Sequence, residues 1–233
     1  MLKRRLARRW IRRLGWLLGG PLAIFRFLRR EILVEEIEAA PTVAPLSADE
    51  PSEAARHPGR GLGALTHHLY AVTVRSPKLS AGQLLAIIAA DPNVVTPTEV
   101  LRVERSAGAL CKGDELLLRM AGPWNGPMRV SEREDDRLQL ATMPGHPQHG
   151  KVELRVRPKN GEADIVIEIQ TCERAAGFGF YLLERIGLIP RMRSHTWAEI
   201  LQNAARLAGG LPPDRITVQC WRGEDEASGT TRA

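Results

Sequence analysis

Two histidines in a turn-rich run are the first residues whose types and spacing could do chemistry. His146 and His149 stand three positions apart, among the prolines and glycines of residues 144–150. On a helix this spacing could direct both imidazoles at one metal ion, but proline and glycine prevent a regular helix here. A loop could still gather them with His195, yet a zinc site needs three or four convergent ligands, and no carboxylate is obviously paired with them. The run therefore predicts a turn whose imidazole bonds to backbone, with no metal and no cofactor.

A second candidate is an acidic cluster at a predicted hairpin end. It contains Glu132, Glu134, Asp135 and Asp136. A carboxyl group acts as a general acid or base near neutral pH when apolar surroundings raise its pKa, and nothing near this cluster indicates such surroundings. The sequence also lacks the fingerprints of serine hydrolases, P-loop proteins, dinucleotide-binding proteins and zinc proteases. We assign no catalytic residues, and these two observations together favour a protein that is not an enzyme.

Large aromatic side chains are the third candidate, and their chemistry would be apolar binding. Trp124 lies in a loop rich in glycine and proline, whereas Tyr181 and Trp197 fall within a long helical pattern. Such residues are most often plain core. If the helix covers a sheet with space beneath it, they would instead line a ligand cavity together with His146 and His149.

The charge of the chain is concentrated at one end. Residues 1–30 hold ten of the 33 Lys and Arg residues and no Asp or Glu, so the remainder carries 23 basic and 27 acidic residues. Such asymmetry indicates a basic arm that meets an anionic partner, while the body has no positive surplus with which to hold nucleic acid. The three cysteines are widely spaced and form no Cys-x-x-Cys pair, which predicts reduced thiols.

The N-terminal arm has the pattern of a basic amphipathic helix. Its apolar residues recur every fourth position from Leu2 to Leu18, with arginines on the other faces. The uncharged run, residues 14–25, is too short to span a bilayer and contains Gly-Gly-Pro. A secretory leader would not be followed at once by arginines. We favour an interfacial helix on an anionic, cytoplasmic membrane face, with docking on the body or on a protein partner as the first alternative. A nucleic-acid arm is the third choice, because the apolar stripe is too long and too regular for a purely electrostatic tail. The residues assigned to that surface are Arg4, Arg5, Arg8, Arg9, Trp10, Arg12, Arg13, Trp16 and Phe25.

The order of elements predicts four regions. Residues 1–39 form the amphipathic helix, and residues 40–66, rich in proline and small residues, form a flexible linker. Residues 67–210 form the folded domain, and residues 211–233 a short strand and a disordered tail.

Within the domain, alternating and helical patterns follow in a definite order. A strand over 69–74 is followed by a helix over 81–90 that Ser80 caps. Strands are then expected over 98–105, 115–120, 128–134, 137–142, 152–156 and 165–170, with an Asn160-Gly161 hairpin turn. A long helical pattern over 180–207, weakened at Gly187 and Pro190, ends at Gly209, and 216–221 could form a last strand. The fold class is therefore α+β, an antiparallel sheet that grips a long C-terminal helix.

This order resembles the helix-grip architecture of the START-like superfamily, which includes polyketide cyclases and lipid-transfer domains. The run Gly145-His146-Pro147-Gln148-His149-Gly150, followed by 152–156, Asn160-Gly161 and 165–171, is similar to a START-like group of unknown function that carries a Gly-His-x-x-x-Gly turn before a hairpin. Lys151 departs from that group, which usually has an acidic residue there. The resemblance covers roughly residues 67–209 and implies a binding chamber without established catalytic residues.

Three functions fit these patterns. The first is a binder of a hydrophobic small molecule or lipid, held peripherally at the inner membrane by its basic arm. The second is a cyclase- or hydrolase-type enzyme that uses a cavity histidine for proton transfer. The third is a scaffold whose N-terminal helix binds a protein partner and whose core is filled. The sequence leaves the oligomeric state open.

Overall fold

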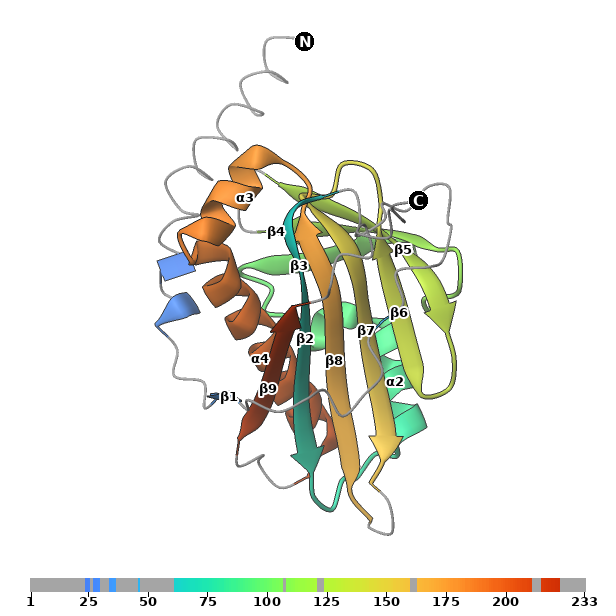
Figure 1. Ribbon diagram of the computed structural model, residues 1–233. Coiled ribbons are helices and arrows are strands. Elements are labelled where there is room, and N and C mark those ends of the chain that lie inside the picture. Colours follow the sequence, from blue (N-terminus) through green and yellow to red (C-terminus); the bar gives the residue numbers. More distant parts are fainter. Residues whose placement is uncertain are drawn as a thin grey trace, which may run out of the picture.

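The computed structural model describes residues 24–25, 27–29, 34–36, 46, 61–106, 108–120, 124–159, 163–210 and 215–222. These residues form one long sheet with helices on one of its faces (Figure 1). The strands are β1 (Val34–Glu36), β2 (Leu62–Val74), β3 (Leu101–Arg105), β4 (Glu115–Met120), β5 (Asn125–Arg133), β6 (Arg137–Thr142), β7 (Gln148–Pro158), β8 (Ile165–Ala175) and β9 (Ile216–Arg222). The helices are α2 (Ala81–Ala90), the 3-10 turn η2 (Pro92–Val94), α3 (Phe178–Arg185) and α4 (Leu188–Ala208).

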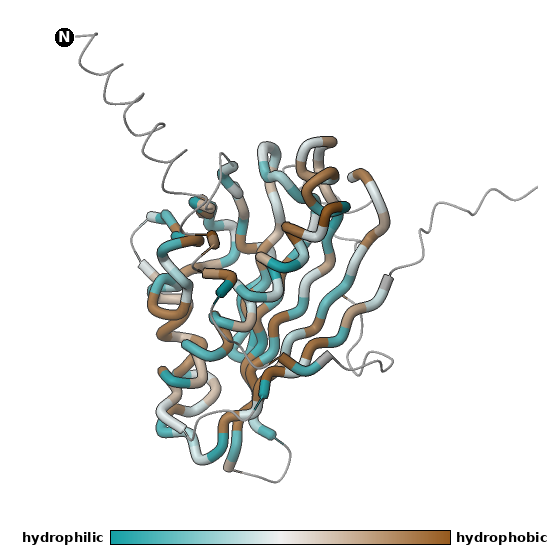
Figure 2. Tube along the Cα trace, turned by 90° about the vertical axis from the view of Figure 1, so that its left-hand side faces the viewer, coloured by the Kyte–Doolittle hydropathy of each residue, from teal (hydrophilic) through white to brown (hydrophobic). Residues whose placement is uncertain are grey.

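The strand order is β1-β9-β2-β8-β7-β6-β5-β4-β3, and the neighbours are antiparallel except for β1 and β9. The run from β3 to β8 is a meander in which each strand pairs with the next along the chain. Apolar and polar residues alternate along the strands, as the brown and teal segments of Figure 2 show. Because side chains alternate between the two faces of a strand, the inner face is apolar and meets the helices.

Helix α4 lies across β2 and β8, and α2 packs on β6 and β7. The core between these layers contains Tyr70, Val72 and Val74 of β2 and the isoleucines of β8. The expected α+β class, with an antiparallel sheet around a long C-terminal helix, is confirmed.

Helix ends follow the predicted chemistry. Ser80 caps α2 in a capping box with Gln83, whose side chain accepts the Ser80 N–H at 2.9 Å. The helical pattern over 180–207 breaks at Gly187, which adopts φ +80°, so α3 and α4 are separate helices. Pro190 does not break α4, because it stands in the first turn, where no intrahelical N–H bond is lost. Gly209 ends α4 with φ +72°.

Some element bounds differ from the sequence-based expectation. Strand β2 begins at Leu62, inside the segment predicted to be linker, because Thr66 and, across an irregularity in the register, Leu62 pair with β8. Residues 34–36, predicted as helix, form β1 because they pair in parallel with residues 216–218 of β9. The Asn160-Gly161 turn, the tail beyond residue 222 and the arm before residue 24 lie outside the described residues. The division into domain and linker otherwise stays a prediction.

Candidate functional site

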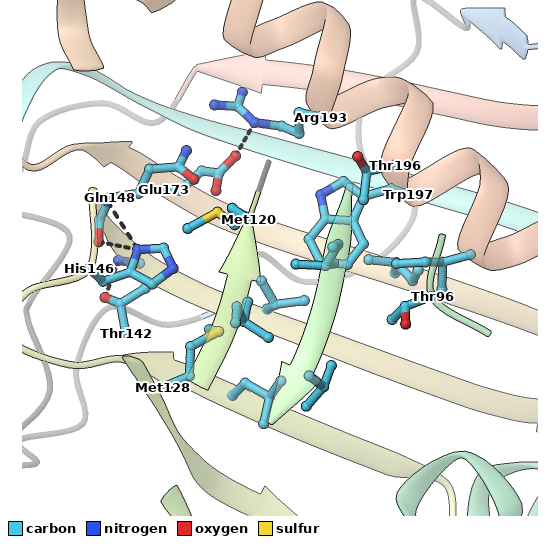
Figure 3. A pocket seen from close by; sticks show the side chains of 18 of the residues that line it. Thr96, Met120, Met128, Thr142, His146, Gln148, Glu173, Arg193, Thr196 and Trp197 are labelled. Atoms are coloured by element: carbon cyan, nitrogen blue, oxygen red, sulfur yellow. Dashed lines mark hydrogen bonds and ion pairs between the residues drawn. The ribbon is translucent and has the colours of Figure 1, made fainter. Parts of the chain in front are cut away.

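A cavity of about 350 Å³ lies between the inner face of the sheet and the helices. Its floor is apolar and comes from successive strands. Helix α4 contributes Trp197, which is labelled in Figure 3, and Ile200 also lines the cavity. The volume falls at the lower end of the range found for sites of small organic ligands. The floor residues include Leu116, Leu118, Met120, Met128, Leu140, Leu154 and Ile169.

Polar groups gather at one end of this cavity. Figure 3 shows the side chains of His146, Gln148, Glu173 and Arg193 there, with Thr142 below His146. They come from the turn before β7, from β7 and β8, and from α4. The cavity is therefore largely apolar, with charged, imidazole and amide side chains at one end and the hydroxyl groups of Thr96 and Thr196 elsewhere in its wall.

A buried ion pair closes the polar end. Arg193 of α4 pairs with Glu173 of β8, and both side chains are less than a tenth exposed. The Arg193 Nη2 also donates to Glu184 Oε1 at 2.8 Å. Burial raises the pKa of Glu173 above its ordinary value, more than the nearby Arg193 lowers it. Two carboxyl groups thus surround one guanidinium. This arrangement suits a neutral hydrogen-bonding group of a ligand better than an additional anionic group.

The turn over residues 145–150 places His146 at the cavity. Gly145 adopts φ +99°, a conformation that favours glycine. The Gln148 backbone N–H donates to His146 Nδ1 at 3.0 Å, so the expected imidazole-to-backbone bond is confirmed for this residue. Gly126 leaves room for the ring, since a Cβ there would lie 2.8 Å from the His146 Nε2. Gly150 lets β7 approach β8, since a Cβ there would lie 2.1 Å from the Cys172 carbonyl oxygen.

Three of the five residues predicted to line a cavity do line it, namely Trp124, His146 and Trp197. His149 is buried, but it alternates with the inward-facing residues of β7 and is not among the residues that line the cavity. Tyr181 is also outside the lining, because its ring lies over Gly63 of β2. Whether any of them contacts a ligand stays a prediction.

The other candidates for chemistry lie apart from the cavity. His195 packs its ring edge on Phe27, with centroids 6.0 Å apart. Glu132 and Glu134 pair with Arg137, whose hydrogen bond lowers the pKa of Glu134. Within the described ranges, no cluster of three or more His, Cys, Asp or Glu side chains could hold a metal ion.

The sequence-based reasoning missed Glu173 and Arg193. The alternation of Ile165, Ile167 and Ile169 continues through Thr171 to Glu173, so it places this carboxylate on the inner face. Arg193 stands four residues after Ile189 and four before Trp197, within the inner stripe of α4. An ionisable residue in phase with each apolar stripe was the available signal for a buried pair.

Only part of the predicted membrane arm can be placed. Phe25 is half exposed, and the Arg29 guanidinium lies 4.2 Å from its ring centroid. Ile24 lines the cavity, and Phe27 is buried. The predicted residues from Arg4 to Trp16 lie outside the described ranges. In the part of the chain that the structure describes, no helix has the length and apolar character needed to cross a bilayer.

No protein-family model and no curated protein matches this chain. Among solved structures, norcoclaurine synthase from Thalictrum flavum, in complex with dopamine and hydroxybenzaldehyde, is similar at 14% identity and a TM-score of 0.45, over 64% of this chain and 87% of that one. A hypothetical protein from Helicobacter pylori is similar at 11% identity and a TM-score of 0.47, over 74% and 99%. The di-domain ARO/CYC protein StfQ of the steffimycin biosynthetic pathway is similar at 12% identity and a TM-score of 0.46, over 63% and 51%. These values are too low to assign a family, so the fold class rests on the observed arrangement of sheet and helix.

Proposed function

We propose that this protein binds a hydrophobic small molecule or lipid in the cavity between the sheet and α4. The observation that carries the proposal is a largely apolar cavity of about 350 Å³ with the Glu173–Arg193 pair, His146 and Gln148 gathered at one end. Apolar surface contributes affinity, and a few placed polar groups fix the orientation of a ligand. A molecule with one hydrogen-bonding head and an apolar body would place the head near Gln148 and Glu173.

Membrane tethering is the second part of the proposal, and its support is the sequence of the N-terminal arm. A cluster of arginines beside an apolar stripe favours an anionic bilayer, and each basic residue near such a surface contributes about 1 kcal/mol. A binder of a hydrophobic molecule on the cytoplasmic face would meet its ligand at the membrane. Flotation of the full chain with anionic vesicles, compared with a chain that lacks residues 1–40, tests this part.

The scaffold alternative has less support, because it requires a filled core. The enzyme alternative has a histidine and a buried carboxyl group at the polar end, but His146 already bonds the backbone of its own turn. We therefore retain binding as the function to be tested first.

The neutral fluorescent probe N-phenyl-1-naphthylamine provides the test. Leu154→Trp should fill part of the cavity and weaken probe binding by about tenfold or more, because the added indole occupies volume that the probe needs. Leu207→Trp is the matched control, since Leu207 packs on the core from α4 without lining the cavity. Probe affinity that is equal in both variants, or no binding to the unaltered chain, would overturn the proposal.

A further inference from the structure

Helix α3 and its C-cap residue expose a ridge of three large apolar side chains. Phe178, Leu182 and Ile186 are 72%, 51% and 67% exposed and stand four residues apart. That spacing places them on one side of the helix. Ile186 is the C-cap residue of α3, and no other described helix has three exposed large apolar side chains even when its cap residues are included. We call Phe178, Leu182 and Ile186 the α3 ridge.

The other side of α3 already has an apolar partner. Phe180 is buried, and both Phe180 and Leu183 line the cavity. Core packing therefore accounts for one side of the helix and leaves the ridge unexplained. Exposed apolar groupings of this kind mark interaction surfaces.

The charges beside the ridge are of one sign. Between Gly177 and Arg191 the exposed charged residues are Arg185 and Arg191, with no exposed acidic residue among them. Glu184, the single acidic residue in this stretch, is engaged by Arg193. An apolar ridge flanked by arginines is complementary to an anionic bilayer, in which arginines meet the head groups and the apolar side chains enter the acyl boundary.

The position of the ridge agrees with this partner. The described residues of the basic N-terminal arm lie beside α3 and α4. Phe27 packs on His195 of α4, and Ile24 lines the same cavity as Leu183 of α3. Phe25 and Arg29, both exposed there, add an aromatic ring and a cation. Figure 1 shows α3 at the end of the molecule where α4 begins.

We propose that the α3 ridge is a docking surface for an anionic lipid bilayer, which sets the α3 wall of the cavity against the membrane. The inference rests on the proposed function for its purpose, since a ligand that partitions into lipid would enter beside α3. The ridge and the N-terminal arm act together: the arm supplies long-range attraction, and the ridge supplies contact that salt does not screen.

The test is flotation of the full chain with vesicles of phosphatidylcholine and phosphatidylglycerol in a 7:3 ratio, at low and high salt. The ridge variant carries Phe178→Gln, Leu182→Gln and Ile186→Gln. The matched control carries Ile87→Gln and Val94→Gln, which remove two exposed apolar side chains from α2 and η2. Because all five side chains are exposed, both variants should fold, and circular dichroism checks this.

The ridge variant should partition about tenfold or more weakly than the unaltered chain, most clearly at high salt, because transfer of large apolar side chains from water is strongly favourable. The control variant should partition like the unaltered chain. Equal partition of the ridge variant, or no flotation of the unaltered chain, would overturn the inference. A dimer that becomes a monomer in the ridge variant would also overturn it, by assigning the ridge to a second copy.

Naphthylamine binding without vesicles separates this inference from the proposed function. If the ridge variant binds the probe normally and floats normally, the docking surface is wrong and the binding function stands. If the unaltered chain does not bind the probe, the binding function fails whatever the flotation result.

Discussion

Replacing His68 with glutamine should make this protein more resistant to acid. His68 lies on the inner register of β2, where its ring stacks on Tyr70 with centroids 6.0 Å apart. Burial is the main cause that lowers the pKa of His68 to about 3, and Arg193 and His67 lower it further. In the folded protein the His68 imidazole therefore stays neutral at the pH values, below about 6.5, at which the same side chain of the unfolded chain binds a proton.

The sign and size of the effect follow from linkage. The histidine side chain of the unfolded chain has a pKa of about 6.5, so below that pH the unfolded state binds a proton that the folded state does not bind. Stability from this group is therefore present above pH 6.5 and is lost as the pH falls toward 3. Between pH 7 and pH 5 the loss is about 2 kcal/mol, because the slope approaches 1.4 kcal/mol per pH unit.

Urea unfolding of the unaltered chain and of His68→Gln at pH 7 and pH 5 measures this loss. The difference at pH 7 reports the changed packing alone, and the change in that difference between the two pH values reports the titration. The other titrating groups are common to both chains, including Glu173, whose raised pKa acts in the opposite direction. We expect the difference to shift by about 2 kcal/mol in favour of the variant. A difference that stays constant with pH would refute a neutral, buried His68.

Four further outcomes follow from local contacts. Gly150→Ala should destabilise the protein by about 3 kcal/mol or more in urea unfolding, because its Cβ would meet the Cys172 carbonyl oxygen. Gly82→Ala should instead stabilise it by up to about 1 kcal/mol, since a Cβ in this helix meets nothing within 4 Å; a loss would contradict the α2 assignment. Asn93→Ala should cost about 1–3 kcal/mol, because the Asn93 amide bonds both the N–H and the C=O of Val103 at 2.9 Å, and hydrogen exchange at Val103 should rise. The Cys172 thiol, buried and with a pKa raised to about 12, should react with Ellman's reagent only on unfolding, whereas the two exposed thiols react at once.

The elements that local chemistry specifies were predictable from the sequence. Helix α2 has the predicted bounds because Ser80 caps its start and Asp91-Pro92 ends it. Strand β6 also has the predicted bounds, because Asp135-Asp136 marks the turn before it. Strand β2 was predicted too short, because its first residues are held through Leu62 and Thr66, which pair with β8, rather than by a local pattern.

The polar end of the cavity was less accessible to sequence reasoning. Arginine and glutamate are rarely buried, so a pattern that assigns them to the surface is correct at most positions. Glu173 and Arg193 are exceptions because each compensates the charge of the other across 20 residues of chain. The pair becomes visible in sequence only when both are seen in phase with apolar stripes.

The sizes of the side chains along α4 explain why a cavity exists at all. Beyond Leu201 the buried residues Ala204, Ala205 and Ala208 are small, so this end of the helix can approach β2 closely, and the Ala208 carbonyl accepts the N–H of Lys78 at 2.8 Å. Every α4 residue that lines the cavity lies between Leu188 and Ile200.

At the start of α4, the Arg193 pair joins the helix to β8 through long side chains. The helix is thus held on both sides of the cavity, by the Arg193 pair at one end and by the Ala208 carbonyl bond and the packing of Leu201 and the alanines at the other. Without such anchoring, close packing of the core would leave few voids larger than a water molecule. Anchoring of α4 on both sides of the cavity therefore favours a cavity that stays open when nothing is bound in it.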